Sequence, residues 1–221
     1  MHNTVQRLQL IKEEIKDICI KKQLKTKPEI IAITKTFSIE KVLPLIEIGH
    51  IHYGENKIQE AENKWIDVKK NYPNLKLHMV GKLQSNKAKK AVDLFDYIHS
   101  LDSSKLAKKI SQYENEINKK TKLFIQINLA EESQKSGILI NDLAEFYNFC
   151  VKDLSLNIIG LMCLPPFNTD TKKYFEILAK ASSKYNLSDL SMGMSDDYVK
   201  AVYCGSTFLR LGTTIFGKRK S

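Results

Sequence analysis

Short apolar runs alternate with stretches of helical periodicity along almost the whole chain. Apolar residues at helical spacing between Val5 and Cys19 predict an opening amphipathic helix, and Pro28 prevents its continuation. Each later apolar run of three to seven residues is followed by a polar or glycine-containing turn and a helical pattern. The runs predict eight strands, at Glu29–Lys35, Ile51–Tyr53, Leu75–Val80, Tyr97–Ser100, Leu123–Leu129, Asn157–Met162, Leu190–Met192 and Thr207–Leu211.

Helical segments separate these strands. The expected helices are Ser38–Ile48, a segment through Trp65 to Lys70, Ser85–Leu94, a segment from Asp102 or Ser103 to Lys120, Asn141–Val151, Thr171–Tyr185 and Asp196–Tyr203. Buried strands that alternate with helices predict a parallel sheet covered on both faces. Eight such units predict a (β/α)8 TIM-type barrel in a single domain, residues 1–221, with an open doubly wound sheet as the alternative.

Composition supports a folded protein without a membrane span. Of the 221 residues, 43% are hydrophobic and 27% charged, which suits a sizeable buried core. No apolar stretch approaches the ~20 residues needed to cross a bilayer. Charges interrupt the apolar positions of the first residues, unlike the core of a signal peptide. We therefore expect a cytoplasmic protein with no membrane partner.

The chain is basic, with 35 Lys and Arg against 25 Asp and Glu and a net charge of +10. This charge permits an RNA partner. However, only Arg7, Arg210 and Arg219 are arginines, the residues that nucleic-acid readers favour. The lysines are spread along helical stretches, and no RNA-recognition motif is present. We expect a lysine-rich solvated surface and no nucleic-acid partner; steeply salt-dependent RNA affinity would revive the alternative.

The sequence contains no metal-ligand pattern. Its four cysteines, Cys19, Cys150, Cys163 and Cys204, form no CxxC pair and are each interpreted as small buried hydrophobic residues. His50 and His52 alternate on an expected strand edge but lack further ligands. We predict neither a metal site nor a disulfide framework.

Lys35 follows the first apolar strand directly, at the end of the barrel where chemistry collects. Desolvation in a barrel mouth lowers the pKa of an amine, and a neutral amine is the nucleophile for a Schiff base. Position alone nevertheless favours a lysine whose ammonium reaches solvent, because the chain has many lysines.

Two segments after the last two strands have features of anion sites. Ser191–Asp197 (SMGMSDD) brings a glycine and two serines to the start of a helix, and Arg210–Gly217 (RLGTTIFG) places Gly212 and two threonines after the final strand. Barrels often bind phosphate in the loops after strands 7 and 8. Helix capping by Ser195 and a turn at Gly212 explain the same residues, so both interpretations stay open.

A lysine after strand 1 and an anion site after strands 7 and 8 suit a ligand with an aldehyde and a phosphate. Pyridoxal 5′-phosphate (PLP) has both. Arg210, facing the pyridine nitrogen, would donate a hydrogen bond but yield no proton, which favours holding the cofactor or racemisation over transamination. A class I aldolase using Lys35 on a sugar phosphate shares these features and remains an alternative.

Eight segments also resemble one known family, the pyridoxal phosphate homeostasis proteins. The resemblance is collinear from Ile30 to Gly217, and HMVGKLQSNK is close to the family signature. The segments are IAITKTFS, HYGENKIQEAENKW, LHMVGKLQSNKAKKAV, HSLDS, INLAEESQKSGI, GLMCLPP, LSMGMSDDYVKAV and GSTFLRLGTTIFG. The resemblance implies a barrel similar to the N-terminal domain of alanine racemase, with PLP held as a covalent aldimine at Lys35.

The resemblance also implies roles for individual residues. Asn56 matches the asparagine beside the cofactor, Ser191 lies in the family's phosphate segment, and Arg210 takes the position of the ring-nitrogen arginine. Gly212 and Thr213 match phosphate-binding residues. Leu77, Ser38 and Thr214 depart from the family pattern and put only loop shape in doubt.

Family members are cytoplasmic, mostly monomeric in bacteria, and linked to vitamin B6 balance without an agreed reaction. We therefore expect a monomer that binds PLP, meets PLP-dependent apo-enzymes at most transiently, and has no dedicated catalytic residue. A PLP-dependent amino-acid racemase is the alternative. Racemases of this type take a second base from an added domain, which we do not expect because the sequence ends soon after Gly217. His78 is interpreted as a pocket wall or a packed strand histidine, and Lys135 as a solvated loop lysine near the mouth.

Overall fold

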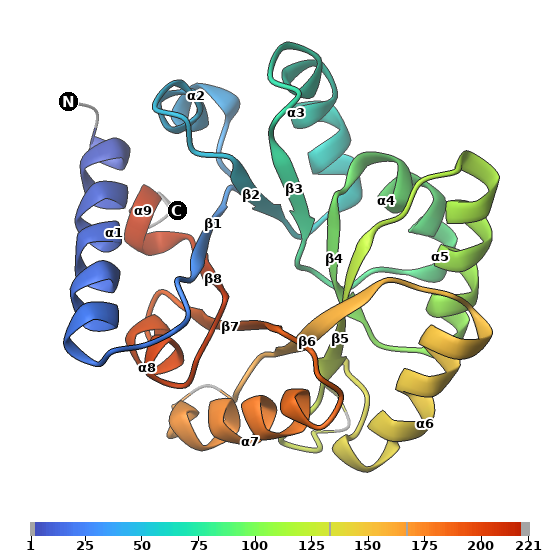
Figure 1. The fold of residues 1–221 in the computed structure, drawn as a ribbon. Coiled ribbons are helices and arrows are strands. Elements are labelled where there is room, and N and C mark those ends of the chain that lie inside the picture. Colours follow the sequence, from blue (N-terminus) through green and yellow to red (C-terminus); the bar gives the residue numbers. More distant parts are fainter. Residues whose placement is uncertain (1–2, 133, 167, 218–221) are drawn as a thin grey trace.

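The computed structural model describes residues 3–132, 134–166 and 168–217, and within them eight parallel strands close into a barrel (Figure 1). The predicted domain also includes residues 1–2, 133, 167 and 218–221, which lie outside the described residues. The strands are β1 (Glu29–Ile33), β2 (His52–Glu55), β3 (Lys76–Met79), β4 (Tyr97–Leu101), β5 (Lys122–Ile127), β6 (Ile158–Cys163), β7 (Asp189–Met194) and β8 (Phe208–Leu211). The TIM-type barrel is therefore confirmed.

Helices surround the barrel, and α1 lies beside α2, α8 and α9 (Figure 1). Their bounds are α1 (Asn3–Lys21), α2 (Ile39–Glu47), α3 (Ile58–Asn71), α4 (Ala88–Leu94), α5 (Ser104–Ile117), α6 (Leu143–Asn148), α7 (Thr171–Ser183), α8 (Tyr198–Tyr203) and α9 (Thr213–Phe216). Short 3-10 turns at Ser85–Lys87 and Ile140–Asp142 precede α4 and α6, and a π-helical turn, Phe149–Asp153, follows α6.

The open doubly wound sheet is wrong because the first and last strands pair. Glu29 aligns with Phe208 and Ala32 with Leu211 along a parallel β1–β8 ladder. Closure satisfies the backbone groups that an open sheet would leave at its edges. It also brings the loop after β1 next to the loop after β8, which places Lys35 and Gly212 at the same end of the barrel.

Two apolar layers hold the fold together. The larger lies between the sheet and the surrounding helices and includes the fully buried rings of Trp65, Phe95 and Phe175. The smaller fills the barrel and consists of Ile31, Ile33, Tyr97, Phe124, Met162 and Phe208. Burial of this area is the main favourable term in folding.

β2 and β7 extend further than the sequence pattern predicts. Gly54 and Glu55 belong to β2. A Cβ at Gly54 would lie 2.6 Å from Ile33 Cδ1, so glycine at this position allows β1 and β2 to pack closely and does not form a turn. β7 continues through Gly193, which adopts φ +91° where the register against β8 shifts. The segment interpreted as an anion loop from Ser191 is therefore strand up to Met194.

The predictions for helix caps and cysteines are confirmed at some positions and wrong at others. The Ser103 side chain caps α5 by accepting from Leu106 N, whereas Ser38 stands at the start of α2 without a capping bond from its side chain. Cys19, Cys150 and Cys163 are buried, but Cys204 is only half-buried.

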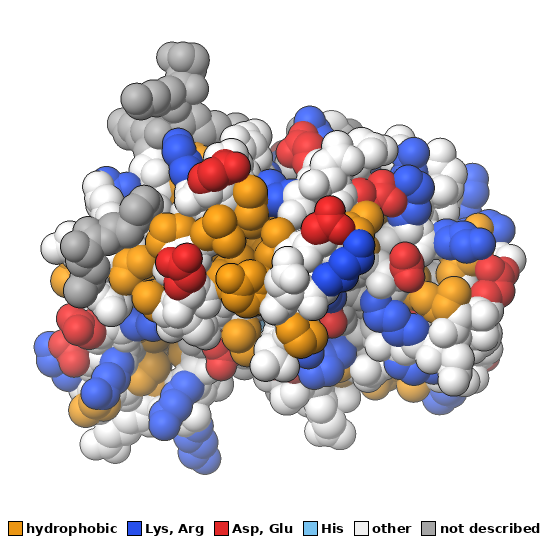
Figure 2. Space-filling model, turned by 90° about the horizontal axis from the view of Figure 1, so that it is seen from above, with side chains coloured by type: hydrophobic (Ala, Val, Ile, Leu, Met, Phe, Trp, Pro, Cys, Tyr) orange, Lys and Arg blue, Asp and Glu red, His pale blue; other side chains and the backbone are white. Residues whose placement is uncertain are grey.

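The structure can be searched for metal sites, membrane-spanning helices and surface patches over all described residues. Within them, no group of histidine, cysteine and carboxylate side chains could hold a metal ion, and no helix has the length and apolarity to cross a bilayer. Figure 2 shows basic and acidic side chains interspersed around an apolar area on one face.

Candidate functional site

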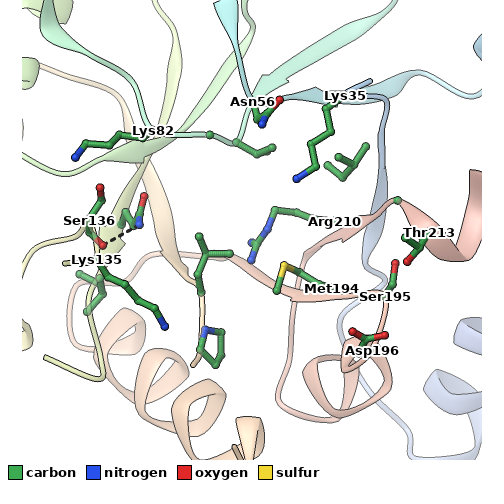
Figure 3. A pocket seen from close by; sticks show the side chains of 18 of the residues that line it. Lys35, Asn56, Lys82, Lys135, Ser136, Met194, Ser195, Asp196, Arg210 and Thr213 are labelled. Carbon is green, nitrogen blue, oxygen red and sulfur yellow. Dashed lines mark hydrogen bonds between the residues drawn. The ribbon is translucent and has the colours of Figure 1, made fainter. Parts of the chain in front are cut away.

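A cavity of about 610 Å³ opens at the carboxyl ends of the strands (Figure 3). Four cationic side chains line it, those of Lys35, Lys82, Lys135 and Arg210, against the carboxylate of Asp196. Apolar walls come from Ile33, Phe37, Val80, Leu164, Pro165 and Met194. This size and lining suit a small anionic ligand with an apolar body.

Lys35 stands immediately after Thr34, a fully buried residue at the end of β1. Thr34 N donates to Gly54 O at 2.9 Å, and Thr34 Oγ1 donates to Glu55 Oε1 at 2.6 Å. The backbone is thus fixed one residue before Lys35. Its side chain projects into the cavity, as does that of Arg210 (Figure 3).

Glu55 anchors this corner from behind the cavity, a role that the sequence reading did not identify. Its carboxylate is fully buried and accepts from Lys64 Nζ at 2.8 Å and from Trp65 Nε1 at 3.0 Å. Lys64 Nζ also donates to Thr34 O at 2.7 Å. The available signal was a carboxylate two residues after a predicted buried strand, because a charge that becomes buried there requires partners.

Asn56 lines the cavity next to the tight contact between β2 and β3. A Cβ at Gly81 would lie 2.3 Å from Asn56 O, so only glycine lets these backbones approach. The buried Asn56 Oδ1 has no hydrogen-bond partner among the described residues. A buried polar atom without a partner at a cavity wall is a natural contact for a ligand.

Arg210 reaches the cavity from β8 although only 4% of it is exposed. It donates from one amino group to Ser191 Oγ at 2.6 Å and from the other to Cys163 O at 2.9 Å. Burial lowers the pKa of its guanidinium from the ordinary value, yet a guanidinium stays protonated in proteins. Bonds to β6 and β7 thus hold a permanent cation at the cavity.

The part of the cavity wall formed by the loops after β7 and β8 is polar. Ser195, Asp196 and Thr213 lie together there, beside Gly212 (Figure 3). Thr214 N donates to Ser195 Oγ at 3.3 Å, which ties the loop after β7 to the loop after β8. A Cβ at Gly212 would meet only Ile33, at an ordinary 3.6 Å. Packing within the protein therefore does not require glycine at this position.

The structure brings five of the six predicted site residues to the cavity wall: Lys35, Asn56, Arg210, Gly212 and Thr213. Ser191 is fully buried and does not line the cavity, because β7 continues past it and its hydroxyl is engaged by Arg210 and His99. Its phosphate contact stays a prediction.

Four further placements concern residues that the sequence left open or did not assign. His78 is a packed strand histidine with no exposed surface and is not part of the cavity wall. Lys135 lines the cavity from the loop after β5, with its side chain 35% exposed and its ammonium 3.0 Å from Glu132 Oε1. Lys82 and Ser195 were not predicted to line it, although Lys82 lies in the GKLQSNK motif.

Comparison with known proteins identifies the fold family and near relatives. Residues 8–220 match the family described as alanine racemase, N-terminal domain. The pyridoxal phosphate homeostasis protein of Pasteurella multocida is 34% identical over 202 residues, 86% of each chain. That of Synechocystis sp. is 36% identical over 199 residues, 86% of this chain and 91% of the relative.

Solved structures agree with this assignment. PipY of Synechococcus elongatus with PLP bound is 32% identical, has a TM-score of 0.79, and is matched over 92% of this chain and 100% of PipY. Alanine racemase of Clostridium difficile shares the fold alone, at 14% identity and a TM-score of 0.72, over 99% of this chain and 57% of the racemase. The chain therefore belongs to the alanine racemase N-terminal domain family and, within it, to the pyridoxal phosphate homeostasis proteins.

Proposed function

We propose that this protein binds PLP in the cavity, holds it as a Schiff base on Lys35, and thereby contributes to vitamin B6 homeostasis. One observation carries the proposal: a lysine side chain projects into a cationic cavity of about 610 Å³ in a chain similar to PipY, which was solved with PLP bound. When bound, PLP would supply an aldehyde that can react with an amine. The protein's own residues decide how it is held.

The cavity offers a partner for each reactive group of PLP. Lys35 supplies the amine after β1, while Ser195, Gly212 and Thr213, after β7 and β8, form a polar part of the wall that suits a phosphate. Four cations against one carboxylate along the wall favour a dianionic group by Coulomb attraction. The absence of a side chain at Gly212 leaves room for phosphate oxygens to approach the backbone.

The cavity walls also suit the aromatic ring of PLP. Ile33, Val80 and Met194 offer apolar surface, and Asn56 Oδ1 offers a polar contact without a protein partner among the described residues. Arg210 would face the ring nitrogen, as the family resemblance implies, and donate a hydrogen bond without releasing a proton. The ring nitrogen then stays unprotonated, which suits storage of the cofactor better than chemistry on a bound amino acid.

The visible absorption spectrum of the purified protein with added PLP tests this proposal. A yellow band that borohydride removes, followed by mass-spectrometric detection of a pyridoxyl group on the Lys35 peptide, is the expected result. Lys35→Ala should lose the band, whereas Lys82→Ala and Lys135→Ala, which change lysines of the same cavity, should keep it. A protein that stays colourless with PLP, or a label on Lys82 or Lys135, would contradict the assignment.

Racemase activity is the alternative function within the same family, and the fold shared with alanine racemase favours testing it. The cavity walls hold no tyrosine or histidine among the described residues, so Lys35 has neither of these side chains opposite it as a second base. We therefore expect no sustained racemisation of alanine in the holoprotein. We further propose a monomeric, cytoplasmic protein that passes PLP to apo-enzymes in transient encounters.

A further inference from the structure

Three histidines form a row of hydrogen bonds through the barrel interior, away from the cavity wall. His52 Nδ1 lies 2.9 Å from His78 Nε2, and His78 Nδ1 lies 2.9 Å from His99 Nε2. His99 Nδ1 lies 2.8 Å from Ser191 Oγ, the hydroxyl that accepts from Arg210. The row therefore connects the first residue of β2 with the arginine of β8.

Aromatic neighbours fix the planes of these rings. The His78 ring stacks on Tyr97 with centroids 4.2 Å apart, and the His99 ring stacks on Phe124 at the same distance. Phe208 contacts both histidine rings from a third strand. TIM barrels normally fill this space with branched aliphatic side chains, so a polar row here needs a reason.

The positions of the protons follow from the Arg210 end. A guanidinium has donors only, so Ser191 Oγ accepts from it. The Ser191 hydroxyl proton then needs an acceptor, and His99 Nδ1 is its other hydrogen-bond partner among the described residues. His99 must therefore carry its proton on Nε2, from which it donates to His78 Nδ1.

The proton positions on His78 and His52 follow in the same way. His78, which accepts at Nδ1, carries its proton on Nε2 and donates to His52 Nδ1. The Nε2 proton of His52 then faces the Glu29 carboxylate, whose Oε2 lies 3.9 Å away, beyond hydrogen-bond distance, on a side chain that is 61% exposed. The opposite direction would leave the Ser191 proton without an acceptor and turn the His52 lone pair toward a carboxylate.

We propose that His52, His78 and His99 are positioning residues for Arg210. With every ring proton on Nε2, they form a hydrogen-bond chain that runs in one direction from the guanidinium to His52, whose remaining N–H faces the Glu29 carboxylate. This chain keeps the lone pairs of Ser191 turned toward Arg210. Its consequence for the cofactor rests on the function proposed above, because Arg210 can serve the ring nitrogen only while its guanidinium is held in this orientation.

Electrostatics agree with neutral rings along the chain. Burial holds the pKa of His78 and His99 well below the ordinary value, and the charge of Arg210 acts in the same direction on His99. Burial also lowers the pKa of His52, although Glu29 opposes the shift. Neutral histidines have one donor and one acceptor each, which a one-directional chain requires.

Nitrogen-15 NMR of the histidine-labelled protein, without any cofactor, tests directly which ring nitrogen of each histidine carries the proton. Long-range proton–nitrogen correlations distinguish the two neutral tautomers from the charged ring. We expect His52, His78 and His99 all in the Nε2–H form at pH 7.5. An Nδ1–H form or a charged ring at His78 or His99 would overturn the proposal, and this measurement needs no variant that might fail to fold.

Two substitutions at His78 then test whether the chain positions Arg210. His78→Leu removes both bonds, whereas His78→Gln keeps one donor and one acceptor about as far apart as the ring nitrogens. His50→Leu is the matched control, since His50 is also buried and hydrogen-bonded, to His52 O, but lies outside the chain. The readouts are the NMR signals of the Arg210 amino groups and the Kd for PLP.

We expect His78→Leu to speed rotation and exchange of the Arg210 amino groups and to raise the Kd for PLP about five- to tenfold, the loss of roughly one hydrogen bond. His78→Gln and His50→Leu should stay within about twofold of the parent protein. Equal effects of His50→Leu and His78→Leu, or unchanged Arg210 signals in His78→Leu, would overturn the positioning role. If the parent protein bound no PLP, the proposed function would fail, while the NMR results would still test the hydrogen-bond chain of the three histidines.

Discussion

The ammonium of Lys64 lies 2.8 Å from Glu55 Oε1, and this ion pair is buried behind the cavity. Only 11% of the Lys64 side chain and none of the Glu55 side chain is exposed. Because Lys64 also donates to Thr34 O, the pair connects the ends of β1 and β2 directly before Lys35. The ion pair therefore also fixes the backbone from which Lys35 enters the cavity.

Removal of one partner should therefore be costly. Lys64→Met leaves the Glu55 carboxylate buried without its cation, and we expect the free energy of unfolding to fall by about 3 kcal/mol. The double variant Glu55→Gln/Lys64→Met should regain at least ~1 kcal/mol, because no charge remains buried. Urea unfolding of the three proteins measures these values.

The exposed pair of Lys70 and Asp67 is the matched control, since its side chains are 71% and 87% exposed. Lys70→Met should cost less than ~1 kcal/mol. A Lys64→Met variant no less stable than Lys70→Met would mean that the buried pair contributes nothing.

Two glycines at the cavity should respond in opposite ways to alanine. Gly81→Ala brings a Cβ to 2.3 Å from Asn56 O, so we expect it to destabilise the protein by about 2 kcal/mol or more. Gly212→Ala meets only Ile33, at 3.6 Å, and should change stability by less than ~1 kcal/mol. If Gly212 serves the phosphate, its variant should still weaken PLP binding about tenfold, a difference of ~1.4 kcal/mol. Thermal unfolding and PLP titration separate the two effects, and unchanged affinity in Gly212→Ala would argue against a phosphate contact there.

The contrast between these glycines shows what the sequence could provide. Strand number and order followed from apolar runs alternating with helical patterns, and the chain positions of Lys35 and Arg210 followed from the strand ends. The exact strand ends did not follow: Gly54 looked like a turn residue but packs against Ile33 within β2, and the strand predicted to end at Met192 continues to Met194. Partners from distant strands, such as His99 with Ser191, are set only by barrel closure.

Arg210→Lys should not behave as a conservative change. The guanidinium donates to two acceptors on different strands, Ser191 Oγ and Cys163 O, and one ammonium on a flexible stem cannot reproduce this planar fork. We expect a loss of about 2 kcal/mol in stability, because Cys163 O loses its side-chain donor in the barrel interior. PLP affinity should fall about tenfold. Urea unfolding and visible titration measure both, and parent-like values for both would show that charge alone suffices at this position.

Stability should also decline in mild acid, and His50 allows the direction to be worked out. Burial, with a smaller contribution from Lys12, lowers the pKa of His50 from 6.5 to about 3. Between these values the unfolded chain binds a proton that the folded protein does not, so the free energy of unfolding decreases as the pH falls below 6.5. At pH 5, one and a half units below the unfolded value, this histidine alone should cost about 2 kcal/mol relative to pH 8.

The slope of stability against pH isolates this contribution. His50→Gln, which can still donate to His52 O, removes the titrating ring, so the slope between pH 5 and 6 should fall by about 1.2 kcal/mol per pH unit. The buried rings of His52, His78 and His99 shift in the same direction and should maintain the remaining slope. Urea unfolding of both proteins at half-unit steps from pH 5 to 8 provides the comparison. Parallel curves for the two proteins would show that His50 takes up its proton in the folded state, and hence that its side chain is not held in a dry environment.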